Sequence, residues 1–106
     1  MKVKDRLRVW HKYTFHCAYC GKIITYKEMQ VDHIIPKNIG GTNDIQNLNP
    51  SCRRCNHYKR TYSIEEYRQL LLTLHERIKK IYINKVGIDY GIIQLNDWDG
   101  KFYFEK

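Results

Sequence analysis

Two pairs of cysteines constrain the fold of this chain more than any other feature. Cys17/Cys20 and Cys52/Cys55 each have the Cys-x-x-Cys spacing. Each pair can supply two thiolates from one tight turn, and two such pairs complete the tetrahedral ligand set that zinc prefers. Gly21 suits the first turn, because such turns often need a positive φ. The spacing therefore predicts a structural four-cysteine zinc site built from two zinc knuckles.

Two disulfides, four unrelated thiols and a redox-active pair are the alternatives to zinc. The chain begins Met1-Lys2-Val3-Lys4-Asp5, which is charged from the start and lacks the apolar stretch of an export signal. We therefore expect a cytoplasmic protein, in which thiols stay reduced. No thioredoxin-like βαβ pattern surrounds either pair, which makes a redox role weak.

The charge of the 106-residue chain is unevenly distributed. The net charge is +8, and residues 1–60 carry 12 Lys and Arg against 4 Asp and Glu, whereas residues 61–106 carry 7 of each. A solubility surface has no reason to concentrate in one half, so the excess indicates a polyanion partner, most often nucleic acid. No apolar run approaches the length of a membrane span, so we expect no membrane partner.

The hydrophobic pattern predicts elements on both sides of the cysteines. Residues 2–13 read as a short basic helix with Val3, Leu7 and Trp10 on one apolar stripe. Residues 23–26 and 29–35 read as strands, and residues 53–60 as a helix with Ser51 as its cap.

The second half of the chain predicts a longer helix and a hairpin. Ser63 and Glu66 form a capping box that opens a helix of about twenty residues. Residues 91–104 read as a β-hairpin around Asp99-Gly100. We expect one α+β domain over residues 1–106, with a metal-centred core at 14–60 and a helix-and-hairpin elaboration at 61–106.

Three side chains between and beside the cysteines have the chemistry of a nuclease. Asp32 can hold a divalent metal through oxygen, and the Asn56 amide carbonyl can be a second ligand. His33 has a pKa suited to taking a proton from water. An Asp-His pair alone is usually structural, and the cysteine frame around this one is what favours catalysis.

Motifs between residues 17 and 59 resemble the HNH endonuclease family. The motifs are Cys17-x-x-Cys20, Asp32-His33-Ile34-Ile35-Pro36, Gly40-Gly41, Asn43-Asp44-Ile45-x-Asn47-Leu48 and Cys52-x-x-Cys55-Asn56-x-x-Lys59. The resemblance, to members of phage or bacterial type, implies a ββα-metal fold of two strands and a helix around a divalent metal, beside a four-cysteine zinc site.

The resemblance also implies roles for individual residues in DNA hydrolysis. His33 would be the general base, Asp32 and Asn56 would bind magnesium or manganese, and Asn47 would pin the loop that orients His33. His57, next to Asn56, would be a phosphate contact or a structural residue. The candidates for nucleic-acid binding on the last helix of the motif are Arg53, Arg54, Lys59 and Arg60.

Two readings compete with an endonuclease. A non-catalytic zinc-finger module would keep the cysteines and the basic charge but would not need Asp32, His33 and Asn56. A regulatory zinc protein could bind another protein through Leu70, Leu74 and Ile78, although the charge asymmetry counts against it. A homodimer, or a partner in phage packaging or restriction, would fit the endonuclease.

Overall fold

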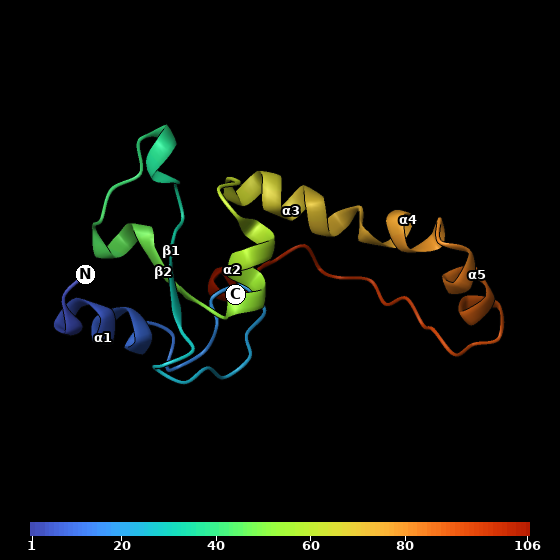
Figure 1. Ribbon diagram of the computed structural model, residues 1–106, viewed down its shortest axis with the longest axis horizontal. Helices are drawn as coiled ribbons and strands as arrows, with labels where there is room; N and C mark the ends of the chain where they lie inside the picture. The colour runs from blue at the N-terminus through green and yellow to red at the C-terminus, as the bar shows by residue number, and fades with distance from the viewer.

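The computed structural model describes residues 1–106, which form five α-helices and one two-stranded sheet (Figure 1). The helices are α1 (Val3–His11), α2 (Arg53–Lys59), α3 (Ile64–Leu72), α4 (Leu74–Lys79) and α5 (Tyr82–Asp89), and the strands are β1 (Gln30–His33) and β2 (Leu48–Ser51). Single 3-10 turns lie at Lys37–Ile39, Ile45–Asn47 and Tyr103–Glu105.

The molecule consists of a core with an extended arm. In Figure 1, α1, the sheet and α2 lie together, while α3, α4 and α5 run away from them in sequence. The chain then returns along the arm and ends beside α2. The principal extents of 50 × 29 × 22 Å reflect this elongated shape. None of the helices combines the length and apolar composition needed to cross a bilayer.

The sheet and α2 form a β–β–α unit. β1 and β2 are antiparallel, with Asp32 opposite Asn49 and His33 opposite Leu48. α2 begins two residues after β2, so the strand delivers the chain directly to the second cysteine pair. The predicted α+β class, with a cysteine cluster beside a small sheet and a helix, is confirmed.

The strand predictions were only partly correct. β1 lies within the predicted strand 29–35, but residues 23–26 contribute a single bridge between His16 and Ile23. The partner of β1 is β2, a segment that the sequence analysis did not recognise as a strand. Pro50 lies opposite Val31 in this strand, and its carbonyl accepts from the Ala18 amide at 2.8 Å.

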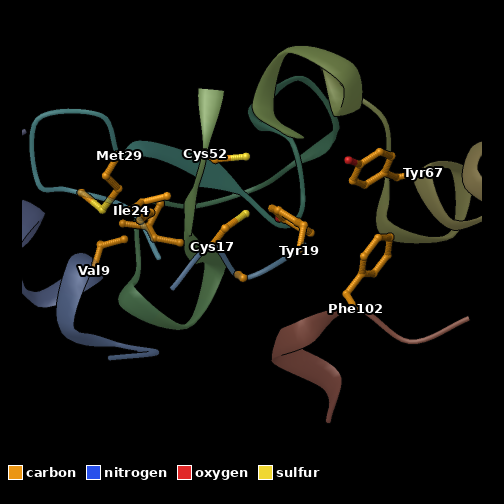
Figure 2. Packing of buried hydrophobic residues seen from close by; sticks show 10 residues of the cluster. Val9, Cys17, Tyr19, Ile24, Met29, Cys52, Tyr67 and Phe102 are labelled. Carbon is orange, nitrogen blue, oxygen red and sulfur yellow. The ribbon is translucent and has the colours of Figure 1, made fainter. Parts of the chain in front are cut away.

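The buried core surrounds the cysteines (Figure 2). Val9 of α1, Ile24 and Met29 gather on one side of Cys17, and each is at most 1% exposed. On the other side, Tyr19 faces an aromatic pair whose rings stack 5.1 Å apart, Tyr67 of α3 and Phe102 of the returning tail. The core therefore joins α1, the first knuckle, α3 and the tail.

The face that α1 presents to the core differs from the predicted stripe. Val9 is fully buried, whereas Val3 is 67% exposed and Leu7 is 38% exposed. Arg6 flanks Val9 on the inner face and donates to the main-chain carbonyls of Tyr26 at 2.8 Å and Met29 at 2.6 Å. Of the predicted stripe only Trp10 packs on the core, because the inner face also carries basic residues that bond the backbone.

The arm also departs from its prediction. The capping box is present, since Ser63 Oγ accepts from Glu66 N and the Glu66 side chain accepts from Ser63 N. The helix that it opens ends after nine residues, however, and Thr73 separates α3 from α4.

The predicted hairpin over 91–104 is wrong, because the tail forms no strand. A turn does form at Asp99-Gly100, with Asp99 Oδ1 accepting from Lys101 N at 2.9 Å. The residues after this turn pack on the core instead of pairing with the residues before it. Phe102 is 1% exposed, and the amide of Phe104 donates to the carbonyl of Ala18 at 2.8 Å.

Candidate functional site

The four cysteines converge on one point. Their sulfur atoms all lie within 4.8 Å of one another, and Cys20 Sγ is 3.9 Å from Cys52 Sγ. Zinc–sulfur bonds of about 2.3 Å in a tetrahedron place sulfur atoms about 3.8 Å apart, so the arrangement fits a zinc ion. Hydrogen bonds among the thiols lower the pKa of Cys17 and raise the pKa of Cys20 and Cys55.

Local turns explain how the two knuckles form. Gly21 has φ of +82°, and its amide donates to the Cys17 carbonyl at 3.0 Å, as a tight turn after Cys20 requires. Cys52, and not the predicted Ser51, caps α2, because its sulfur accepts from the amide of Cys55. The second knuckle is therefore also the start of α2.

α2 carries candidate site residues as well as a cysteine. Asn56 directly follows Cys55, and Lys59 lies one helical turn further on. Asn56 is half-buried, whereas Arg53, Arg54, His57 and Arg60 are exposed. Any metal held by the cysteines would thereby fix the helix that presents Asn56.

Asp32 is buried near the end of β1, and one of its carboxylate oxygens meets two partners. Its Oδ2 atom accepts from the Tyr19 hydroxyl and lies 3.0 Å from Lys59 Nζ. Burial, followed by the charge of Asp32, raises the pKa of Tyr19, so this hydroxyl keeps its proton and remains a donor. Asn49 Nδ2 lies 3.5 Å from the same hydroxyl.

Lys59 does not fit its predicted contact with a phosphate. Its side chain is fully buried, and Nζ forms an ion pair with Asp32 and donates a hydrogen bond to the main-chain carbonyl of His33 at 3.1 Å. A buried lysine needs a charge partner, and here the Asp32 carboxylate provides one. The ammonium group is therefore part of the interior and does not lie on the surface of α2.

His33 is held through one ring nitrogen. Its Nε2 atom is 2.8 Å from Asn43 Oδ1. With that amide oxygen as the acceptor, Nε2 carries the proton and Nδ1 is the nitrogen able to accept one. Asn43 was not among the predicted site residues, although it belongs to the motif that ends at Leu48.

Asn47 bonds across the loop that follows His33. Its side chain accepts from Ile35 N at 2.8 Å and donates to the carbonyls of Ile35 at 3.1 Å and Thr42 at 2.8 Å. Its own carbonyl accepts from Ile34 N at 2.9 Å. These four bonds fix both ends of the loop relative to β2.

Two concavities meet at His33. A cavity of about 400 Å³ brings Asp32, His33 and Asn56 together, and its rim includes Arg60. A larger groove of about 770 Å³ runs from His33 beneath α1. Its charged lining residues are Lys2, Asp5, Arg6, Arg8, Lys37 and Asp44. Lys37 borders both concavities, so the basic surface continues from α1 to the smaller cavity.

The sequence thus predicted the residues that line the smaller cavity, but it did not predict that Tyr19 holds one of them, Asp32. Tyr19 was not singled out, because an aromatic residue inside a knuckle is usually core. The only signal for it is its place between Cys17 and Cys20.

Comparison with known proteins shows the family of this chain. The sequence model of the HNH endonuclease family matches residues 17–72. The CRISPR-associated endonuclease Cas9 of Corynebacterium diphtheriae is 48% identical over 44 residues, covering 41% of this chain and 4% of that protein. The Cas9 of Actinomyces naeslundii is 32% identical over 83 residues, covering 77% of this chain and 7% of that protein.

A solved structure shares the fold. The crystal structure of the Type II-C Cas9 enzyme from Actinomyces naeslundii aligns with a TM-score of 0.56 at 35% identity, over 61% of this chain and 8% of that one. The chain therefore spans less than a tenth of the length of these relatives. On the family match, the identity to the Actinomyces naeslundii relative and the shared fold, this chain belongs to the HNH endonuclease family.

Proposed function

We propose that this chain is a metal-dependent endonuclease that hydrolyses phosphodiester bonds of DNA. The observation that carries the proposal is the single cavity lined by Asp32, His33 and Asn56. A carboxylate, an amide and an imidazole in one small basic cavity are the groups that metal-assisted phosphodiester hydrolysis needs. The names of the two curated relatives, CRISPR-associated endonucleases, agree with this chemistry.

The residues present fit a hard divalent ion. Asp32 and Asn56 offer oxygen ligands from β1 and α2, which leaves room for water and phosphate oxygens, as magnesium and manganese prefer. Once bound, such an ion would neutralise charge on the phosphate and on the leaving 3′ oxygen. The cysteine cluster would hold zinc in a structural role, because all four of its ligands come from the protein.

His33 would act as the general base. Asn43 holds Nε2, so Nδ1 is the nitrogen that takes a proton from water as the water attacks phosphorus. Asn47 would keep the loop after His33 in place and thereby keep the imidazole directed at the cavity. The products would carry a 5′-phosphate and a 3′-hydroxyl.

The basic groove beneath α1 would bind the DNA backbone. Arg8 and Lys37 are exposed along it, and Arg60 lies at the rim of the smaller cavity. Arg53 and Arg54 are exposed on the first turn of α2 and would add phosphate contacts. Such contacts bind any sequence, so we expect affinity without strong base preference.

A plasmid assay tests the proposal. Supercoiled DNA is incubated with the purified protein and magnesium, manganese or EDTA, for the wild type, His33→Ala and His75→Ala. His75 lies on α4 in the arm and lines neither of these concavities, so it is a matched control. We expect metal-dependent nicking or linearisation that His33→Ala abolishes and His75→Ala retains.

Binding of the same DNA is measured in parallel by fluorescence anisotropy, and we expect His33→Ala to bind nearly as tightly as the wild type. Cleavage by His33→Ala would remove this residue from the mechanism. Tight binding without cleavage in either metal would instead favour the non-catalytic zinc-finger module.

A further inference from the structure

The buried ammonium group of Lys59 is the most unusual charged group that the proposed hydrolysis does not use. It is the only lysine or arginine among the buried residues, and it lies beside the carboxylate proposed to bind the catalytic metal. Burying a charge costs several kcal/mol unless it is paired and hydrogen-bonded. Nζ meets that requirement through an ion pair with Asp32 Oδ2 at 3.0 Å and a hydrogen bond to the His33 carbonyl at 3.1 Å.

Asp32 Oδ2 is also bonded from a second direction, by Tyr19. The Tyr19 hydroxyl donates to this oxygen, and the ring lies edge-on to Tyr67 and Phe102 at centroid distances of 5.7 Å and 5.5 Å. The carboxylate is thus held by a hydrogen bond from the first knuckle and by an ion pair from α2. Both partners contact Oδ2, and Oδ1 is the oxygen that neither of them contacts.

Tyr19 in turn is placed by the cysteine site. It stands between Cys17 and Cys20, and its ring lies between Cys17 and the pair formed by Tyr67 and Phe102 (Figure 2). Its carbonyl also accepts from the amide of Tyr103 at 3.1 Å. A shift of the first knuckle would therefore move the hydroxyl that holds Asp32.

We propose that Tyr19 and Lys59 are positioning residues, which hold Asp32 through Oδ2 and leave Oδ1 for a divalent ion. The cysteine site places Tyr19 and thereby also fixes the position of Asp32. This inference rests on the metal-binding role of Asp32 in the proposed function. Partners that orient a metal ligand commonly change metal affinity 10- to 100-fold when removed. Tyr19 supplies orientation only, whereas Lys59 also balances the buried negative charge before a metal arrives.

The first test measures manganese affinity by electron paramagnetic resonance, without DNA. Tyr19→Phe removes the hydroxyl and keeps the ring, and we expect its dissociation constant to rise about 10-fold. Tyr58→Phe is the matched control, because this ring belongs to the same aromatic cluster but its hydroxyl accepts from Arg77 and does not contact Asp32. We expect wild-type affinity for the control and an unchanged zinc content for both variants.

The second test measures thermal unfolding of Lys59→Met with and without manganese. The variant leaves the Asp32 carboxylate buried without its counter-charge, so we expect a lower Tm than the wild type in EDTA. Manganese can supply the missing charge, so it should raise the Tm of Lys59→Met by more degrees than it raises that of the wild type. A residue with a packing role alone would lower the Tm equally in both conditions.

The outcomes separate this inference from the proposed function. Wild-type manganese affinity in Tyr19→Phe, together with an equal manganese response in Lys59→Met, would overturn the positioning role while cleavage by the wild type stands. Weaker binding in Tyr19→Phe from a wild type that does not cleave DNA would support the positioning role and overturn the endonuclease. An Asp32→Asn variant that binds manganese like the wild type would overturn both.

Discussion

At the scale of single residues, Asn47 shows how one side chain can set the shape of a loop. Its amide satisfies three main-chain groups, on Ile35 and Thr42, which lie seven positions apart in the sequence. Between them the chain makes a 3-10 turn at Lys37–Ile39 and passes Gly41, where a Cβ atom would lie 1.6 Å from the Ile35 carbonyl oxygen. The close approach and the amide bonds keep both ends of this loop together.

Replacing Asn47 with alanine should therefore destabilise the protein and impair the site. Three lost hydrogen bonds at a half-buried position should lower the free energy of unfolding by about 1–3 kcal/mol, measured by urea denaturation. Gln46→Ala, a neighbouring exposed residue with no side-chain hydrogen bond, is the control and should stay within about 0.5 kcal/mol of the wild type. Equal stabilities of the two variants would contradict the pinning role.

At the scale of elements, α1 carries two kinds of basic residue. Arg6 faces inward and satisfies the carbonyls of Tyr26 and Met29. Lys12 also faces inward, and its Nζ donates to the carbonyls of Ile45 at 3.0 Å and Leu48 at 2.8 Å, while burial lowers its pKa. Arg8 is exposed and lines the groove. The helix therefore uses similar side chains both to fasten itself to the core and to face the groove.

This division predicts opposite effects for two neighbouring substitutions. Arg6→Ala leaves two carbonyls without their donor and should cost about 1–3 kcal/mol of stability, measured by urea denaturation. Arg8→Ala should leave stability unchanged but weaken DNA binding. For this variant, the negative slope of log affinity against log salt concentration should be less steep by about 0.9, the value for one lost phosphate contact. Equal loss of stability in both variants would contradict the two orientations.

The elements that the sequence predicted well are those whose formation depends on residues close together in the chain. The capping box at Ser63 and the two knuckles each depend on side chains within a few residues, so spacing alone located them. The inner face of α1 could not be predicted from hydrophobic periodicity, because on this face two basic residues, Arg6 and Lys12, flank the buried Val9. The tail does not form the predicted hairpin: an isolated two-stranded hairpin is marginal in water, and Phe102 stacks on Tyr67 instead.

The candidate site likewise contains residues whose role the sequence predicted and residues whose role it did not. Asp32, His33 and Asn56 were predicted from motif spacing, and the structure brings them to one cavity. The role of Lys59 could not be read from the sequence, since whether a lysine on a basic helix is exposed depends on which face packs on the sheet. Tyr19 contacts Asp32, 13 positions away, and Asn43 contacts His33, 10 positions away. Only the folded chain reveals these contacts.

At the scale of the whole molecule, the cysteine cluster is the point through which separate parts of the chain are joined. It links the first knuckle, which carries Tyr19, to α2, which carries Asn56. The tail is fastened to the same knuckle through the amides of Tyr103 and Phe104. Only 16 of 106 residues are buried, so apolar packing is limited and the contribution of a bound metal to folding should be large.

Removal of zinc should therefore unfold the core and not merely inactivate the site. Binding to a four-thiolate site contributes folding free energy, because the unfolded chain lacks the preformed ligand set. We expect the protein treated with a strong zinc chelator, and Cys52→Ser, to lose the cooperative thermal transition followed by circular dichroism. Adding zinc back should restore the transition in the wild type but not in Cys52→Ser. A chelated protein that melts like the untreated one would show that hydrogen bonds and aromatic packing hold the knuckles without a metal.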